Sequence, residues 1–245
     1  MDARTQFIET VTPLQEQLWN AGQLALPVTE PRLRLWTYRA PGVVLGCSQA
    51  ALRERVAGTY ALAGSLVQRG SGGGAVLTGP WMVSASIVLP PDHALVGGGT
   101  VSSYRWLGAL HAGLLRDAGI SAYAIAPEEV RLRQDEADAR LKWACYGGLS
   151  PWEVMVGRRK IVGLAQLRRR TGVLITSGTL IAAPDWSLLC EALGQSSGDA
   201  ELLSACTTSY AEQLGAPVIA EVLAERLHHM LTDVLGEPRG QTLGV

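Results

Sequence analysis

The sequence predicts an α+β fold in which helices pack against a mixed, largely antiparallel sheet. Strand-like segments follow one another across short glycine or proline turns, which is typical of antiparallel pairing. Helical segments fall between them without the regular alternation of parallel βαβ units. The chain has 245 residues, of which 47% are hydrophobic and 18% are charged, so it is long enough to enclose a large core.

The first half of the chain begins with a helix signal and continues with strands. Thr12 can cap free backbone N–H groups, and Pro13 suits the first position of the helix that follows. Alternating or short apolar runs between turn residues predict strands over residues 32–38, 43–46, 66–69 and 82–89. Residues 49–62 are typical of a helix, whereas we expect residues 1–10 to be frayed.

The second half adds a long helix, three strands and two further helices. The helix over residues 102–118 carries apolar side chains at three- and four-residue spacing and ends at Gly119. His111 lies on that apolar face, which favours a hydrogen-bonded core histidine over a catalytic one. We expect the remaining strands over residues 153–156, 160–167 and 173–181, and the helices over residues 186–193 and 217–235.

The polar, glycine-containing segment 194–199 is expected to be a linker. It separates a first domain, residues 1–194, from a small helical extension, residues 195–245, that packs on the same domain. The last helix of the extension has one apolar stripe, and charged residues interrupt its other faces. This pattern predicts core packing rather than a membrane span.

Charge and cysteine content argue against several classes of function. The formal net charge of −1 lacks the excess of lysine and arginine that nucleic-acid binding requires. The sequence has no run of eighteen apolar residues, so no membrane partner is expected. Four cysteines without C-x-x-C spacing give no indication of a metal site. No signal-peptide pattern is found, which predicts a cytoplasmic protein.

A glycine-rich stretch between two predicted strands is the first candidate for a binding site. Ser71 is followed by Gly72, Gly73 and Gly74. Because glycine has no Cβ, backbone N–H groups here can approach an anionic or planar ligand closely. The stretch is neither a P-loop nor a dinucleotide motif, since it lacks the lysine of the first and the helix of the second. A flexible hairpin loop is the alternative.

A second stretch carries the candidate reactive groups. Cys145 lies in the glycine-containing segment A-C-Y-G-G-L-S-P, and Lys160 follows fifteen residues later. A nearby cation would lower the pKa of the thiol toward the thiolate, which is the nucleophilic form. The alternatives are a small buried hydrophobic cysteine and an ordinary surface lysine in a basic turn.

Together these stretches resemble the biotin/lipoate protein ligase superfamily, in the branch of lipoate-protein ligase A and the cysteine-dependent octanoyltransferases. The matching motifs are R-G-S-G-G-G-A-V (69–76), G-R-R-K-I-V-G-L-A-Q (157–166), S-G-T-L (177–180) and, more weakly, V-V-L-G-C-S-Q (43–49). The resemblance covers roughly residues 10–185. It implies the catalytic core shared by biotin protein ligases and class II aminoacyl-tRNA synthetases.

The resemblance also implies roles for individual residues. Cys145 would be the nucleophile, and Lys160 would stabilise the negative charge that develops on the acyl carbonyl oxygen. No metal ligand is implied. The residues expected to bind the acyl group or an acyl-adenylate are Arg69, Ser71, Gly72, Gly73, Gly74, Ala75, Val76, Leu77, Gly163, Ala165, Gly178 and Thr179.

Three functions follow as hypotheses. In the first, an octanoyl or lipoyl group passes from a carrier thioester, such as acyl carrier protein, through Cys145 to a lysine of a lipoyl domain, with no cofactor. The lipoyl domain would belong to an acyltransferase subunit of a 2-oxoacid dehydrogenase or to the glycine cleavage H protein. In the second, the protein is a lipoate-protein ligase that uses ATP and Mg²⁺. In the third, it binds lipoyl domains without catalysis.

The departures from the family pattern bear on this choice. Ligases of the superfamily carry His-Asp where this chain has Thr78 and Gly79, and Arg-Asn-Asp where it has residues 150–153, Ser-Pro-Trp-Glu. These differences argue against adenylation, whereas the glycine stretch itself is closer to the ligase form. The charged residues 128–142 indicate a solvated surface, with a docking surface for an acyl carrier as the alternative.

Overall fold

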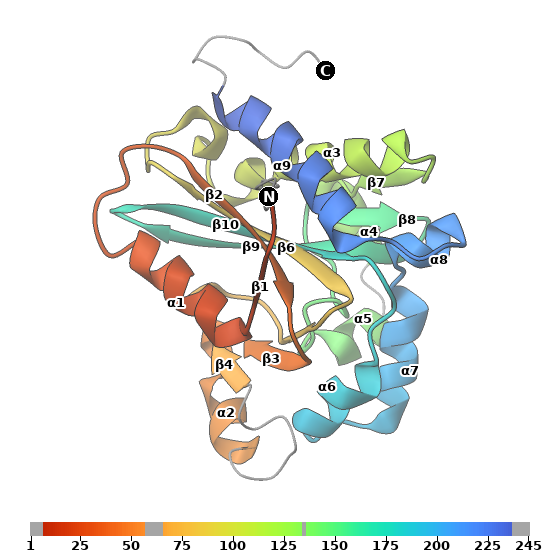
Figure 1. Ribbon diagram of the computed structural model, residues 1–245. Coiled ribbons are helices and arrows are strands. Elements are labelled where there is room, and N and C mark those ends of the chain that lie inside the picture. The colour runs from red at the N-terminus through yellow and green to blue at the C-terminus, as the bar shows by residue number, and fades with distance from the viewer. Residues whose placement is uncertain (1–6, 57–65, 134–135, 237–245) are drawn as a thin grey trace, which may run out of the picture.

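A computed structural model describes residues 7–56, 66–133 and 136–236 of the chain (Figure 1). A seven-stranded sheet has the order β1-β2-β6-β10-β9-β8-β7, and a three-stranded sheet has the order β4-β3-β5. In the large sheet β1 is parallel to β2, and every other neighbouring pair of described strands is antiparallel. The predicted fold class, helices against a mixed and largely antiparallel sheet, is therefore confirmed.

The elements have the following bounds. The strands are β1 (Glu9–Val11), β2 (Arg32–Tyr38), β3 (Gly42–Leu45), β4 (Leu66–Gln68), β5 (Val76–Thr78), β6 (Met82–Leu89), β7 (Ala122–Ala124), β8 (Val154–Val156), β9 (Arg159–Arg169) and β10 (Gly172–Leu180). The helices are α1 (Pro13–Gln23), α2 (Ala50–Val56), α3 (Thr100–Asp117), α4 (Pro127–Arg133), α5 (Glu136–Leu141), α6 (Trp186–Ala192), α7 (Ser197–Cys206), α8 (Tyr210–Leu214) and α9 (Ala220–Gly236). Two short 3₁₀ helices are η1 (Cys47–Gln49) and η3 (Ala94–Val96).

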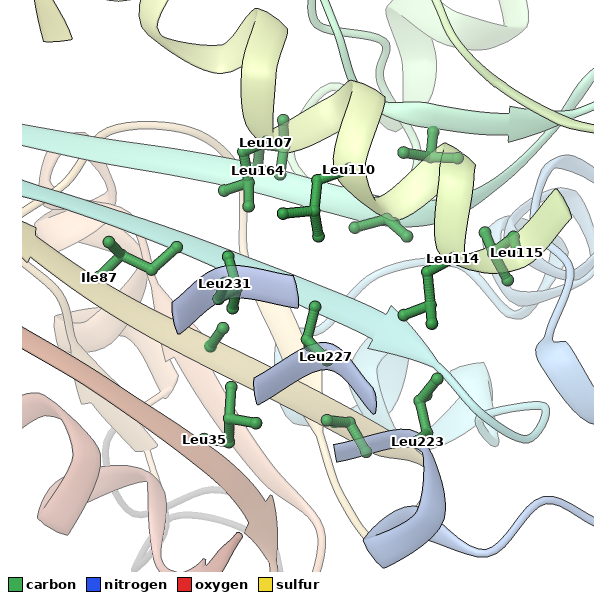
Figure 2. Close-up of a cluster of buried hydrophobic side chains, with 14 of the residues drawn as sticks. Leu35, Ile87, Leu107, Leu110, Leu114, Leu115, Leu164, Leu223, Leu227 and Leu231 are labelled. Carbon is green, nitrogen blue, oxygen red and sulfur yellow. The ribbon is translucent and has the colours of Figure 1, made fainter. Parts of the chain in front are cut away.

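One face of the large sheet is covered by α3 and α9. Figure 2 shows leucines of both helices pointing toward the strands, among them Leu107, Leu227 and Leu231, which are at most 1% exposed. They meet the inward side chains of β2 and β6, such as Leu35 and Ile87. The apolar spacing on α9 thus packs against the core, as the sequence predicts. None of the described helices has the length and apolarity needed to cross a membrane.

The opposite face of the sheet carries α1 and the small sheet (Figure 1). Strand register places Gly163 of β9, Gly178 of β10, Ser84 of β6 and Trp36 of β2 in one row across this face, because directly opposed residues share a face. Three of these four side chains are small or absent. The covering elements therefore leave room above this row.

Helix α1 begins as predicted. The Thr12 side chain accepts the N–H of Gln15, while the Gln15 side chain accepts the N–H of Thr12, so the two residues form a capping box. Pro13 occupies the first turn. Strands β2 and β6 have the bounds that alternation predicts.

Several expectations about the other elements were wrong. The predicted strands on either side of the glycine stretch, β4 and β6, do not pair, because they belong to different sheets. Residues 76–78 form the additional strand β5, which pairs with β3, as does β4. Residues 9–11 form β1 instead of a frayed end. The expected linker 194–199 contains the start of α7, which Ser196 caps. Residues 57–62 of the predicted helix 49–62 lie outside the described residues.

The C-terminal helices share the core of the preceding residues. Helix α9 packs on α3, β2 and β6, and α7 packs on α5, α6 and β9. Leu203 of α7 belongs to the buried cluster beneath the small sheet, together with Leu45 and Leu77. The extension is thus in contact with the large sheet on both faces, while a domain boundary at residue 194 stays a prediction.

Candidate active site

The glycine loop (residues 69–75) and the cysteine loop (residues 143–150) pair directly, although about seventy residues separate them. The Ala75 N–H donates to the Trp143 carbonyl at 2.7 Å, and the Cys145 N–H donates to the Ala75 carbonyl at 2.8 Å. A Cβ at Gly74 would lie 2.6 Å from the Ala144 carbonyl carbon. Glycine is therefore required at position 74 for the two loops to approach so closely.

Arg69 braces the glycine loop from inside. Its side chain is buried, and its guanidinium donates to the carbonyls of Gly72 at 2.8 Å, Gly74 at 2.9 Å and Val44 at 3.4 Å. Gly73 has a φ of +92°, a conformation that L side chains rarely adopt. Most of the donors of Arg69 are thus used to shape the loop, and Arg69 also lines the adjoining cavity.

Cys145 lies at one end of a cavity between the large sheet and the small sheet. A Cβ at Gly163 would come 3.6 Å from the Cys145 Sγ and 3.5 Å from the Tyr146 ring, so the thiol lies directly over the bare backbone of β9. The cavity crosses β9, β10, β6 and β2. Its lining residues are Glu16, Gln17, Tyr38, Val44, Arg69, Val76, Thr78, Met82, Ser84, Cys145, Tyr146, Gly163, Leu164, Ala165, Thr176, Ser177 and Gly178.

The far end of the cavity is polar, which sequence reasoning did not find. The Tyr38 hydroxyl donates to the Glu16 carboxylate at 2.8 Å and lies 2.9 Å from the Ser84 hydroxyl. Burial raises the pKa of Glu16, although the hydrogen bond from Tyr38 acts in the opposite direction. Glu16 lies on α1, where helical periodicity alone gives no sign that a glutamate faces inward.

The electrostatic surroundings of Cys145 differ from the expectation. Burial raises the pKa of the Cys145 thiol, Lys160 and Arg69 lower it, and Glu153 raises it further. Burial is the largest of these effects, so the thiol is held neutral at rest. The expected shift toward the thiolate is thus wrong in its net direction, because a cation in a dry site offsets only part of the desolvation of the thiolate.

Lys160 is buried beneath the cysteine loop instead of lying in a surface turn. Its ammonium donates to the Cys145 carbonyl at 2.7 Å, to the Gly148 carbonyl and to the Glu153 carboxylate at 2.7 Å. These three bonds use all three donors of a lysine. The side chain is 1% exposed and supports the cysteine loop from below, without reaching the cavity itself.

Glu153 is the second residue that sequence reasoning missed. Its carboxylate pairs with Lys160 and accepts the Ser150 N–H at 2.8 Å. Burial raises the pKa of Glu153, whereas Lys160 lowers it. The available signal was a single glutamate inside the otherwise apolar run P-W-E-V-M-V.

The other predicted site residues fall into two groups. Val76, Ala165 and Gly178 line the cavity, and Ser71 lines a neighbouring polar cavity on the other side of Arg69. Gly72, Gly73, Gly74 and Ala75 of the glycine loop are not among the lining residues of either cavity. Leu77 and Thr179 do not line either cavity.

Strand alternation explains these two misplacements. Leu77 points into the apolar cluster beside α6, because its neighbours Val76 and Thr78 point into the cavity. Thr179 points to the opposite face of the large sheet, near His111.

His111 is a hydrogen-bonded core histidine, as predicted. Its Nε2 lies 2.9 Å from the Ser177 hydroxyl, and the side chain is 1% exposed on the face of the sheet opposite Cys145. Burial lowers its pKa to about 4. Among the described residues there is no cluster of three or more histidine, cysteine, aspartate or glutamate side chains that could hold a metal ion.

Comparison with curated proteins finds octanoyltransferases. Octanoyltransferase LipM of Moorella thermoacetica is 33% identical over 162 residues, which are 62% of this chain and 54% of that protein. Octanoyltransferase LipM of Kyrpidia tusciae is 29% identical over 212 residues, which are 84% of this chain and 76% of that protein. The chain thus spans about half the length of the first relative and three quarters of the second.

Comparison with solved structures finds lipoate-protein ligases. Lipoate-protein ligase A bound with ATP superposes with a TM-score of 0.61 at 16% identity, covering 96% of this chain and 86% of that one. The bipartite lipoate-protein ligase of Thermoplasma acidophilum, described with its E2 lipoyl domain, gives a TM-score of 0.60 at 15% identity and covers 97% and 86%. At these identities the likeness shows a shared fold.

A family model decides the assignment. The lipoyl protein ligase A/B catalytic domain matches residues 12–231, which include both loops, the cavity and most of α9. The relatives named above are octanoyltransferases and lipoate-protein ligases, and both kinds are enzymes. The chain belongs to the lipoyl protein ligase A/B catalytic domain family.

Proposed function

We propose that this protein transfers an octanoyl or lipoyl group from a carrier thioester to Cys145, and then to a lysine of a lipoyl domain. The observation that carries the proposal is the position of the Cys145 thiol, which lines the cavity and lies over the bare backbone of Gly163. An acyl chain attached to that sulfur can extend into the cavity. The similarity to two octanoyltransferases supports the same reaction.

The first step is a thioester exchange. The Cys145 sulfur attacks the carbonyl carbon of the donor thioester, the bond from that carbon to the carrier sulfur breaks, and the proton of Cys145 passes to the departing carrier thiol. In the second step a neutral lysine amine attacks the Cys145 thioester. The amide bond forms, the bond from the acyl carbon to the Cys145 sulfur breaks, and the proton that the amine loses returns to that sulfur. Neither step needs a metal or a nucleotide.

Lys160 supports both steps through its charge and its grip on the cysteine loop. Its ammonium lies close enough to lower the pKa of the thiol, and the same charge favours the oxyanion of each tetrahedral intermediate. To touch that oxyanion directly, Lys160 would have to release one of the two backbone carbonyls that it holds. Arg69 is the residue of the glycine loop that lines the cavity beside Cys145.

The partners follow from the same chemistry. We propose acyl carrier protein as the donor, and as acceptors the lipoyl domains of 2-oxoacid dehydrogenase acyltransferase subunits or the glycine cleavage H protein. The likeness in fold to a ligase described with its E2 lipoyl domain supports a lipoyl-domain acceptor. We also propose that the protein works in the cytoplasm, where a free thiol such as that of Cys145 is kept reduced.

An ATP-dependent lipoate-protein ligase is the second candidate, favoured by the ligase-like form of the glycine loop. ATP and Mg²⁺ would then activate a free acid as its adenylate. The residues present fit this chemistry poorly. Glu153 stands where ligases of the superfamily carry an aspartate, and its carboxylate is already bonded to Lys160 and to the Ser150 N–H.

The test is a transfer assay that follows the mass of an unmodified lipoyl domain. We expect the wild-type protein to add one octanoyl group from octanoyl-carrier thioester without ATP, and Cys145→Ala to add none. Modification only with lipoate and ATP, at an unchanged rate in Cys145→Ala, would establish the ligase. Binding of the lipoyl domain without any product under either condition would point to a non-catalytic protein.

A further inference from the structure

The structure contains a buried ion pair directly beneath the proposed nucleophile. Glu153 and Lys160 are each 1% exposed, and their charged atoms lie 2.7 Å apart. The other two donors of the lysine hold the carbonyls of Cys145 and Gly148. The ammonium therefore joins the glutamate to the backbone of the cysteine loop.

The backbone that presents Glu153 is held in an uncommon conformation. The preceding residue, Trp152, has a φ of 70°, and a tryptophan in the left-handed region is strained. Its N–H donates to the Ile125 carbonyl at 2.7 Å, and the Ile125 N–H donates to the Glu153 carbonyl at 2.9 Å. A Cβ at Gly108 of α3 would lie 2.1 Å from the Trp152 carbonyl oxygen. The segment at Ile125 and helix α3 thus hold a strained turn that directs Glu153 inward.

A counterion is needed if the lysine is to stay charged at this depth. Removing an ammonium from water favours its neutral form, and a nearby carboxylate favours the charged form. The other charged or titratable groups that face the pair or the thiol are Tyr104 of α3, Tyr146 of the cysteine loop and Arg69 of the glycine loop. None of these three groups of the described chain is a carboxylate. Glu153 is therefore the anion that faces Lys160.

We propose that Glu153 is a positioning residue for acyl transfer: it holds the Lys160 ammonium under the cysteine loop, so that the lysine charge acts on the Cys145 sulfur. This inference rests on the proposed function for its biological meaning. The ion pair and the strained turn are independent of which acyl donor is used. Glu153 therefore acts through Lys160 and does not touch the substrate.

The proposal predicts the direction in which the pKa of Cys145 moves when Glu153 is replaced. A merely structural role of Glu153 predicts no such direction. Glu153 alone is a negative charge that disfavours the thiolate, so its removal with Lys160 still charged would lower the pKa of Cys145. If Glu153 holds the Lys160 ammonium in place, its removal releases the lysine side chain, and the thiolate loses the cation that favours it. Glu153→Gln would then raise the pKa of Cys145.

The experiment measures the rate of Cys145 alkylation by iodoacetamide as a function of pH, with the labelled peptide identified by mass. We expect the midpoint of the curve to move upward by about one pH unit in Glu153→Gln, as in Lys160→Gln. The double variant should behave as Lys160→Gln alone. A downward shift in Glu153→Gln, or no shift, would overturn the proposal.

Two controls separate the positioning role from a loss of structure. Glu212→Gln removes the exposed ion pair with Arg159, next to Lys160 in sequence, and should leave the curve unchanged. Glu153→Asp keeps the charge and should keep the wild-type curve, even if Glu153→Gln fails to fold. A curve for Glu153→Asp that shifts upward as that of Lys160→Gln does would contradict the proposal. Alkylation needs no acyl donor, so this result is independent of whether acyl transfer itself is found.

Discussion

At the scale of single residues, the proposed nucleophile Cys145 is partly exposed, yet its pKa lies above the ordinary value. Burial raises the pKa of the thiol more than Lys160 and Arg69 lower it. A thiol that is neutral at rest is less exposed to oxidation than a thiolate. The reactivity of the thiol then depends on the groups that contact the sulfur. One of them is the backbone of Gly163, which has no side chain to block an acyl group.

Gly163→Ala should separate activity from stability. The added methyl group would meet its neighbours at 3.5–3.7 Å, which is ordinary contact, but one of those neighbours is the Cys145 Sγ. We expect the melting temperature to stay within about 4 °C of wild type and Cys145 acylation to slow by about a hundredfold. Gly22→Ala, where nothing lies within 4 Å, is the matched control. Unchanged acylation in Gly163→Ala would place the acyl carbonyl elsewhere.

His111 should make the protein sensitive to mild acid. Burial lowers its pKa in the folded state to about 4 from the ordinary value of 6.5, so between these values the unfolded chain binds more protons. Stability therefore rises with pH over this range. We expect the wild-type protein to lose about 2 kcal/mol of unfolding free energy between pH 7 and pH 5 through this residue.

The measurement is urea unfolding at the two pH values for wild type and His111→Gln. The variant should be less sensitive to acid by about that 2 kcal/mol. Equal acid sensitivity in wild type and His111→Gln would show that His111 is not buried in its neutral form.

At the scale of elements, the site is made where two loops pair across the chain. Neither loop is anchored by its own hairpin, because β3 separates β4 from β5. The Ala75–Cys145 hydrogen bond and the absence of a side chain at Gly74 hold the loops together instead. The geometry of the nucleophile therefore depends on a glycine about seventy residues away.

Gly74→Ala should damage both loops. Its Cβ would lie 2.6–2.8 Å from backbone atoms of Trp143, Ala144 and Cys145, and backbone cannot move aside as a flexible side chain can. We expect a loss of about 1–3 kcal/mol in unfolding free energy and little acylation of Cys145. Gly72→Ala, with nothing within 4 Å of the added carbon, should fold and react nearly as wild type. Wild-type stability in Gly74→Ala would contradict the observed pairing.

Patterns within a short stretch of sequence predicted the elements that have a regular alternation or a clear capping residue. Strand β6 alternates regularly and has the predicted bounds, and α1 starts at its capping box. The three-stranded arrangement around β3 could not be predicted, because strand pairing between distant segments leaves no periodic mark in either strand. Short helix α7 was missed since its polar, glycine-containing start is also typical of a loop.

The candidate site was predictable to a similar degree. Cys145, Arg69 and Gly163 were found from motifs and do lie around one cavity. Glu153 was not found, because its role comes from a strained turn and a partner on another strand. Thr179 was expected at the binding site together with Gly178. It lies on the opposite face of the large sheet, because consecutive residues of a strand point to opposite faces.

At the scale of the whole molecule, the two faces of the large sheet have different roles. Its face toward α3 and α9 holds the main apolar core, and its face toward the small sheet holds the cavity. Helix α9 comes last in the chain, yet it closes the core against β2 and β6. We therefore expect the C-terminal extension to unfold together with the strands that carry the site.

Leu227→Ala tests this coupling. The side chain is 1% exposed within the core shared with the sheet, and its truncation should cost about 2–5 kcal/mol. The whole unfolding transition should shift, with a single midpoint for the far-ultraviolet circular dichroism and the tryptophan fluorescence. Val222→Ala, on the exposed side of α9, is the control. Separate midpoints for the two signals would show that residues 195–245 fold as a unit of their own.

The central claim is that Cys145 carries the acyl group, and intact mass spectrometry tests it most directly. The protein is incubated with octanoyl-carrier thioester without ATP, and then weighed before and after hydroxylamine treatment. We predict one added octanoyl group that hydroxylamine removes, present in Cys47→Ala and absent in Cys145→Ala. No adduct on the wild-type protein, together with lipoyl-domain modification only when lipoate and ATP are both supplied, would contradict the account.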